Sequence, residues 1–370
     1  MKSKLLSLLS RKTSSGFFIP EIDGLRFLAI ISVILFHLNG YMIERSTVMF
    51  LDHPSSSLLY YILSNGSFGV QLFFVISGFI LAFPFGKYYF KDCARKIDLN
   101  HYFLRRITRI EPPYIINILI LFLLTPQATN LSYKELLPNL FASLFYSHNI
   151  FLPDSRMINS VAWSLEIEVQ FYIIMPIIAY LFGISNRFSR RIIIILISIV
   201  FQFFQYFKLV PPPITIMNYA QYFLIGLLLA DIYIVDWKNM PNKYWFWDII
   251  GLLMMILQMF IFSSTVLTVF FSPYIILILY MSVFQSKFIN KVFTNIWVIT
   301  IGGMCYTIYL WHYQIISLLG RFTKYLAFTK YYSVNILLQS IIIVPILLLI
   351  CSLLFILWEK PFMIKSASHK

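Results

Sequence analysis

Long apolar segments follow one another along the whole chain, each close to the length of a membrane crossing. Between Arg26 and His37, ten consecutive residues carry no formal charge and are mostly Leu, Ile, Val, Ala and Phe. A helix of this composition lies in hydrocarbon, and about 20 residues cross the bilayer core. On the same basis we predict crossings at residues 23–43, 66–85, 108–125, 163–184, 191–207, 217–235, 244–263, 265–284, 295–317 and 334–358.

The composition agrees with this pattern. Hydrophobic residues make up 59% of the chain and charged residues 12%, whereas charged residues make up about 25% of ordinary soluble domains. A chain of 370 residues has room for roughly ten crossings and no sizeable soluble domain. We therefore predict an all-α, polytopic membrane protein with about ten transmembrane helices. The three cysteines are widely spaced, so neither a disulfide framework nor a zinc site is indicated, and we expect no bound metal.

The net charge of +14 is explained by topology rather than by a nucleic-acid partner. If the N-terminus is cytoplasmic, most of the 29 Lys and Arg residues fall in cytoplasmic segments, as the positive-inside rule requires. We expect a multi-pass protein of the plasma (inner) membrane with both termini in the cytoplasm. Its predicted parts are a basic leader over 1–22 with no signal-peptide cleavage site, a transmembrane domain over 23–362 and a cytoplasmic tail over 363–370.

The first crossing carries two polar residues that need an explanation. Arg26 and His37 are eleven residues apart, so they share one helix face and are separated by roughly 16 Å along the helix. An ionisable residue inside the bilayer costs about 2.5 kcal/mol or more unless it is partnered or solvated. His37 is therefore either a functional residue or a histidine hydrogen-bonded between helices.

Two further ionisable residues lie at a similar depth. Glu168 in the segment WSLEIEVQFY and His312 in CYTIYLWHYQ both lie roughly 8 to 9 Å below the predicted outer surface, as His37 does. We expect these three residues to share a polar cavity in which Glu168 orients an imidazole. Glu166 is about 200° away from Glu168 around the helix, so we place Glu166 at the membrane interface and Glu168 facing inward.

The predicted second cytoplasmic loop is strongly basic. Arg105, Arg106 and Arg109 precede Pro112 and Pro113, which we expect to start or kink the third crossing. Guanidinium groups at this density either bind phosphate or simply set the topology. In the long outer region at 126–162, the apolar piece Leu136–Leu152 is too short and broken for a crossing and reads as a re-entrant or interfacial helix.

Several of these segments together resemble the acyltransferase 3 family of membrane acyltransferases, whose members O-acylate surface polysaccharides, peptidoglycan, lipid-linked sugars and some antibiotics. The matching stretches are DGLR followed by ten residues and His37, GVQLFFVISGF, RRITRIEPPY, WSLEIEVQFY, IYLWH and the final WEKPF. The resemblance implies that Arg26 and His37 are essential for catalysis. The chain departs from the family pattern at Gln71, where the family usually has Asp. Many members also carry a C-terminal SGNH-type domain, which we expect this chain to lack, so a separate periplasmic transferase is one expected partner.

These observations predict a membrane O-acyltransferase. The acyl group, most simply acetyl, would pass from cytoplasmic acyl-CoA to a hydroxyl of an extracytoplasmic glycan or lipid-linked sugar such as O-antigen or exopolysaccharide, either directly or through a covalent acyl-enzyme. The predicted catalytic residues are His37, Glu168, Arg26 and His312, and the predicted acetyl-CoA ligands are Arg26, Arg105, Arg106 and Arg109. Besides the donor and the acceptor, membrane lipids are the expected partners. The alternative is a transporter or flippase of lipid-linked sugars, because buried ionisable residues also mark transport pathways.

Overall fold

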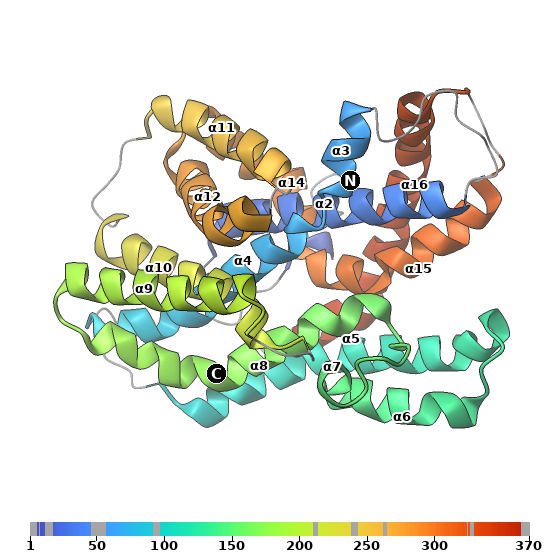
Figure 1. The fold of residues 1–370 in the computed structure, drawn as a ribbon, viewed down its shortest axis with the longest axis horizontal. Coiled ribbons are helices and arrows are strands. Elements are labelled where there is room, and N and C mark those ends of the chain that lie inside the picture. Colours follow the sequence, from blue (N-terminus) through green and yellow to red (C-terminus); the bar gives the residue numbers. More distant parts are fainter. Residues whose placement is uncertain are drawn as a thin grey trace. The chain divides into compact units, whose positions relative to one another are not determined.

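The computed structural model describes residues 6, 8–11, 18–45, 57–91, 97–209, 214–237, 243–261, 265–323, 325 and 329–363. Most of the predicted leader, the loop residues Cys93, Arg95 and Lys96, and the tail beyond Met363 lie outside this part. The described residues form helices and turns, with no β-strand among them. They belong to two compact units, one made of residues 1–70 and 291–370 and the other of residues 71–290 (Figure 1).

The helices confirm an all-α membrane protein. Within the described residues, seven helical segments are long and apolar enough to cross a membrane, and two shorter apolar helices, α10 (Ala220–Val235) and α11 (Phe246–Phe260), accompany them. The consecutive helices α14 (Ile296–Gly303) and α15 (Cys305–Thr323) cover the remaining predicted crossing. The seven segments contain α2 (Pro20–Arg45), α3 and α4 (Leu58–Ser64 and Phe68–Tyr89), α5 (Leu99–Ala128), α8 (Trp163–Ile178), α9 (Arg187–Tyr206), α12 (Thr265–Gln285) and α16 (Tyr332–Leu354).

In the first unit, α2 runs parallel to α14 and α15. Gly302 packs against the backbone of Asp23, and His312 lies beside His37. Farther along, Gly320 packs against the ring of Tyr41. Residue numbers rise in the same direction along α2 and along α14 and α15, so the two segments are parallel (Figure 1). The predicted first and ninth crossings also share one direction.

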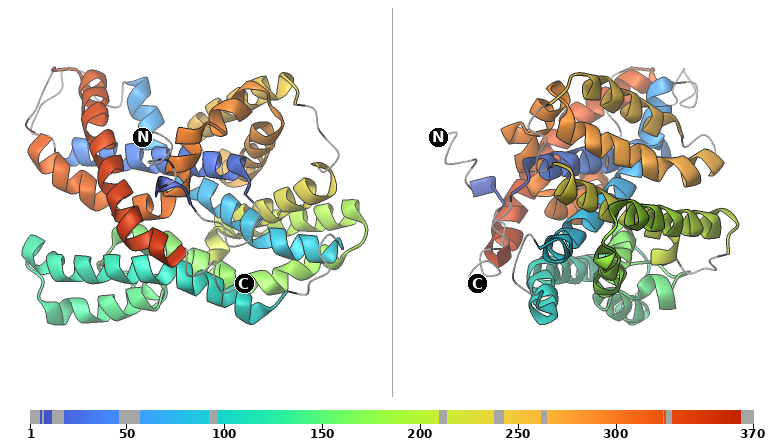
Figure 2. Two further views of the ribbon diagram at one scale, coloured as in Figure 1. Left: turned by 180° about the vertical axis from the view of Figure 1, so that it is seen from behind. Right: turned by 90° about the vertical axis from the view of Figure 1, so that its left-hand side faces the viewer.

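Helix α16 returns along α15 in the opposite direction, with the Gln339 amide donating to the carbonyl of Thr323 at 2.9 Å, and it meets α2 near the end of that helix. The Tyr332 hydroxyl donates a hydrogen bond to Asn39 near the end of α2, 2.5 Å away. At its other end α16 passes into a π-helical turn, Phe355–Glu359, whose Trp358 ring lies 5.5 Å from that of Trp311. Helix α16, red in Figure 2, therefore completes the first unit by packing on both α2 and α15.

In the second unit, α4 and α10 touch through glycines. Gly78 packs against the carbonyl group of Phe223, and Gly226 packs against the carbonyl of Val75 and the Cα of Gly78. Small residues allow such close approach between helices in a membrane.

A buried ion cluster joins α9 to α10. Asp231 is fully buried and accepts hydrogen bonds from Arg190 and Arg191, while Asp236 pairs with Arg191 at 2.7 Å. A buried charge is tolerated when it is paired and hydrogen-bonded. Asp231 therefore ties α9 and α10 together.

Helix α6 (Tyr133–Leu144) doubles back along α5. The Tyr133 hydroxyl donates to the carbonyl of Leu123, and the Tyr114 hydroxyl donates to the carbonyl of Ser143. The two helices are therefore antiparallel neighbours, as Figure 2 also shows. At 12 residues α6 is about 18 Å long, too short to cross the bilayer core. It is followed by the four-residue helix α7 (His148–Phe151).

The close contact between α4 and α10 at Gly226 can be tested by substitution. A methyl group added by Gly226→Ala would meet backbone atoms, which cannot move aside as a side chain can, so overpacking should cost about 1–3 kcal/mol. The measurement is the thermal denaturation midpoint of the purified protein in detergent. Gly40→Ala is the matched control, because a Cβ at Gly40 meets nothing within 4 Å. Equal midpoints for the two variants would show that the close contact is absent.

Candidate active site

The first unit brings two of the predicted site residues together. His37 on α2 and His312 on α15 have ring centroids 5.0 Å apart, with the ring planes tilted by 49°. The Tyr313 ring lies edge-on to His37 at 5.2 Å. His312 is fully buried, whereas His37 is partly exposed. The predicted proximity of these two histidines is therefore present in the structure.

The surroundings of His312 determine which of its ring nitrogens carries the proton. Nδ1 lies 2.8 Å from the carbonyl oxygen of Tyr309 and 3.2 Å from that of Ile308, one turn earlier in the same helix. Carbonyl oxygens only accept hydrogen bonds, so Nδ1 must be the donor and Nε2 then carries the lone pair of the neutral ring. Within the described part of the chain, Nε2 is buried and has no hydrogen-bond partner. The ring of His312, beside His37, therefore carries a buried hydrogen-bond acceptor at Nε2.

Arg26 is held by a carboxylate of its own helix. Its Nη1 lies 2.5 Å from Oδ1 of Asp23, three residues earlier, and Asp23 is almost fully buried. Arg11 approaches the same oxygen at 3.6 Å. The aspartate of the DGLR segment thus orients Arg26, which the sequence analysis did not identify.

A second carboxylate supports the helix that carries His312. Glu359, buried in the π-helical turn, accepts hydrogen bonds from the backbone N–H of Thr307 at 3.1 Å and from its hydroxyl at 2.5 Å. Thr307 lies in the first turn of α15, where backbone N–H groups lack helical partners and the helix dipole favours a negative charge. Glu359 therefore caps α15 from a residue that is distant in sequence.

Glu168 belongs to the second unit and has partners there. Its Oε1 accepts hydrogen bonds from the hydroxyl groups of Ser77 on α4 and Tyr172, both at 2.6 Å. The i, i+4 spacing of Glu168 and Tyr172 on α8 explains the second bond. A cavity shared by Glu168 with the two histidines stays a prediction.

The arginine cluster lies on a helix rather than in a loop, which corrects the sequence analysis. Helix α5 begins at Leu99, capped by Asp98, and continues through Pro112 and Pro113, so the prolines do not start it. At 30 residues α5 is about 45 Å long, against about 30 Å for the bilayer core. Its N-terminal turns can therefore extend beyond the hydrocarbon. Phosphate binding by Arg105, Arg106 and Arg109 stays a prediction.

The expected position of Glu166 was wrong. Glu166 is fully buried and accepts hydrogen bonds from the backbone N–H groups of His148 and Asn149, at 3.1 and 2.8 Å. These are the first N–H groups of α7, so the carboxylate caps that helix. Burial also lowers the pKa of His148. The two glutamates do point to different sides of α8, as expected, but protein covers the Glu166 side.

Gln71, which departs from the family pattern, lies in a network of neutral groups. Its side-chain oxygen accepts a hydrogen bond from the Ser272 hydroxyl at 3.2 Å, and the Gln258 amide donates to that hydroxyl at 2.9 Å. Ser272 and Gln258 are buried. The amide thus joins α4 to α11 and α12 through hydrogen bonds that need no charge.

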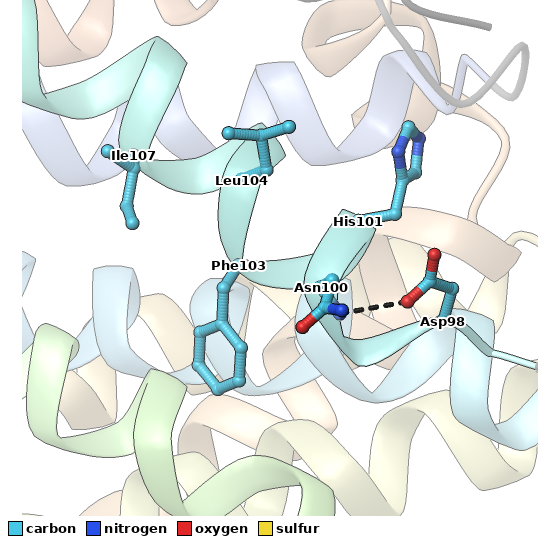
Figure 3. A pocket seen from close by; sticks show the side chains of 6 residues that line it. All are labelled: Asp98, Asn100, His101, Phe103, Leu104 and Ile107. Atoms are coloured by element: carbon cyan, nitrogen blue, oxygen red, sulfur yellow. Dashed lines mark hydrogen bonds between the residues drawn. The ribbon is translucent and has the colours of Figure 1, made fainter.

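A hollow of about 420 Å³ lies at the start of α5 (Figure 3). None of the predicted site residues lines it. Its lining consists of Asp98, Asn100, His101, Phe103, Leu104 and Ile107. Among the described residues, no group of three or more His, Cys, Asp or Glu side chains is arranged to hold a metal ion.

Comparison with known proteins identifies the family. The model of a family described as an acyltransferase domain matches residues 19–357, so the chain belongs to this acyltransferase family. It is 28% identical over 335 residues to the "Putative O-acetyltransferase SACOL0978" of Staphylococcus aureus strain COL, covering 81% of this chain and 51% of that protein. It is 27% identical over 344 residues to the O-acetyltransferase OatA of Staphylococcus aureus strain NCTC 8325, covering 84% and 53%.

The chain thus spans about half the length of the curated relatives it matches. No solved structure matches it.

The cap on α15 can be tested by its effect on stability. Glu359→Ala leaves the N–H and hydroxyl of Thr307 without their acceptor, which should cost about 1–3 kcal/mol. Glu359→Gln keeps an acceptor oxygen and should cost less. Thermal denaturation of the purified protein measures both. The control is Glu44→Ala, at an exposed position near the end of α2. An unchanged midpoint for Glu359→Ala would rule out the capping role.

Proposed function

We propose that this chain is a membrane O-acetyltransferase. It would move an acyl group, most simply acetyl, from cytoplasmic acyl-CoA to a hydroxyl of an extracytoplasmic glycan such as O-antigen or exopolysaccharide. Family membership and the O-acetyltransferase names of the relatives support this reaction class. The observation that carries the proposal is the contact between a partly exposed and a fully buried histidine on two parallel helices.

His37 is the general base in this proposal. A neutral imidazole has one N–H and one lone pair. During the proposed reaction, the free lone pair on Nε2 of His312 would accept the N–H of His37, so that the other nitrogen of His37 takes the proton of the sugar hydroxyl. The hydroxyl oxygen then attacks the thioester carbonyl, the C–S bond breaks, and the proton passes from His37 to the departing CoA sulfur. The sugar hydroxyl and the acyl-CoA thioester are therefore the only reactants that the step needs.

The remaining predicted residues take supporting roles. Arginine guanidinium groups form strong, paired hydrogen bonds with phosphate oxygens, so we assign the donor phosphates to Arg26 and the arginines of α5. Glu168 is the proposed catalytic carboxylate. It lies in the second unit, where the hydroxyl groups of Ser77 and Tyr172 donate hydrogen bonds to it. The proposed location is the plasma membrane with both termini cytoplasmic. The proposed partners are acyl-CoA, the acceptor glycan, membrane lipids and, where the family's periplasmic step is needed, a separate transferase.

The first test follows CoA release from acetyl-CoA by the purified protein with a glycan acceptor, together with the mass of the acceptor. Wild-type protein should release CoA and add one acetyl unit per transfer. Loss of a general base should lower the rate about 10²–10⁴-fold in His37→Ala. His101→Ala, at the start of α5 and outside the proposed machinery, should keep the wild-type rate. Undiminished turnover in His37→Ala removes this residue from the mechanism, and sugar movement without CoA release would favour a transporter.

The second test concerns His312 as a positioning residue. His312→Ala should lower kcat at least about tenfold and leave KM for acetyl-CoA unchanged, because the residue orients the base without contacting the donor. His312→Gln places an amide oxygen near the former Nε2 and should recover part of the loss. Steady-state kinetics separate kcat from KM. A rise in KM with unchanged kcat would assign His312 to donor binding instead.

A further inference from the structure

The three arginines of α5 are not equivalent. At 100° per residue, Arg105 and Arg109 lie about 40° apart around the helix, whereas Arg106 lies about 60° from Arg109. Arg106 is on the side that packs against aromatic rings. Its guanidinium carbon lies 3.7 Å from the ring centre of Tyr102 and 5.8 Å from that of Tyr172. Its Nη1 also donates to the carbonyl of Tyr102 at 2.7 Å.

These rings lead from Arg106 to Glu168. The Tyr102 hydroxyl donates to the backbone carbonyl of Tyr172 at 3.2 Å, which ties α5 to α8. The Tyr172 hydroxyl donates to Oε1 of Glu168 at 2.6 Å. The ring of Tyr172 therefore faces the guanidinium of Arg106, while its hydroxyl fixes the carboxylate.

The arrangement limits what Arg106 can bind. A guanidinium stacked on aromatic rings gains about 0.5–2 kcal/mol from the cation–π interaction. One of its in-plane donors, on Nη1, is already used by the carbonyl of Tyr102, so fewer donors remain for a phosphate. Arg109 is different. Within the described ranges, no hydrogen bond or ion pair engages its side chain, so all of its donors are available.

We propose that Arg106 is a positioning residue for Glu168, acting through Tyr172, and that Arg109 contacts the donor phosphates. The assignment rests on the proposed acyl-CoA reaction and divides a basic cluster whose members look alike in sequence. Arg106 fixes the ring of Tyr172, and Tyr172 fixes the carboxylate. Without Arg106 the ring loses its stacking partner, and Glu168 loses a defined orientation.

The test compares single variants of the full chain by two measurements, steady-state kinetics with acetyl-CoA and calorimetric binding of CoA without acceptor. Arg109→Ala should weaken CoA binding and raise KM about tenfold, and Arg109→Lys should keep part of the affinity because it keeps the charge. Arg106→Ala and Arg106→Lys should both lower kcat at least about tenfold with unchanged CoA affinity, because lysine cannot reproduce the planar stack.

Two further variants complete the set. Tyr172→Phe removes only the hydroxyl that holds Glu168, and it should match Arg106→Ala in kcat and in CoA affinity. Arg321→Ala removes an exposed arginine at the end of α15 and should change neither quantity. Thermal denaturation shows whether each variant folds. If an alanine variant does not fold, the lysine variant at the same position replaces it in the comparison.

Three results would overturn the assignment. CoA binding weakened in Arg106→Ala as much as in Arg109→Ala would make Arg106 a phosphate contact. Full activity of Tyr172→Phe would break the link to Glu168. Wild-type protein that neither binds CoA nor releases it from acetyl-CoA would reject the proposed function and this assignment with it, and that outcome is visible before any variant is compared.

Discussion

Polar groups inside an apolar helix bundle need partners within the protein, and this constraint shapes both units. Three buried carboxylates meet it in different ways. Asp231 pairs with the arginines of a neighbouring helix, whereas Glu166 and Glu359 each accept backbone N–H groups from the first turn of a helix. Each arrangement stabilises a charge that hydrocarbon would otherwise penalise by several kcal/mol, and each ties one helix to another element. These buried charges therefore fix the positions of helices in the fold, whatever chemistry the protein carries out.

His312 departs from this pattern in an informative way. One ring nitrogen is engaged by two carbonyl oxygens of its own helix, while the other is buried without a partner among the described residues. A purely structural histidine would use both nitrogens, since an unpaired buried acceptor costs about 1–3 kcal/mol. The cost is understandable if the lone pair is reserved for His37 during the proposed reaction. The same reasoning does not single out Glu168, because both hydrogen bonds to its Oε1 come from neighbouring hydroxyl groups.

The sequence predicted what depends on local pattern and failed where the partner is distant. Apolar length correctly predicted an all-α membrane protein, in which seven described helical segments are long and apolar enough to cross a membrane. The similar predicted depths of His37 and His312 agree with the contact between their rings. The helical period correctly separated Glu166 from Glu168, but it could not show that protein rather than interface covers the Glu166 side. Of the two alternatives for Pro112 and Pro113, a start of the third crossing is ruled out, because α5 is already capped by Asp98 several turns earlier. Nothing local relates Glu359 to Thr307, which is 52 residues away, or Arg106 to the ring of Tyr172.

Close helix packing connects this architecture to the proposed chemistry. The rings of His37 on α2 and His312 on α15 lie 5.0 Å apart, so the two helices must pack against each other at this level. Along α2 the approach is fixed on both sides of His37. At one end Gly302 packs against the backbone of Asp23, and at the other Gly320 packs against the ring of Tyr41. A larger residue at Gly302 would displace α14 from α2, and one at Gly320 would displace α15, so these glycines support the geometry of the histidine pair although neither contacts it.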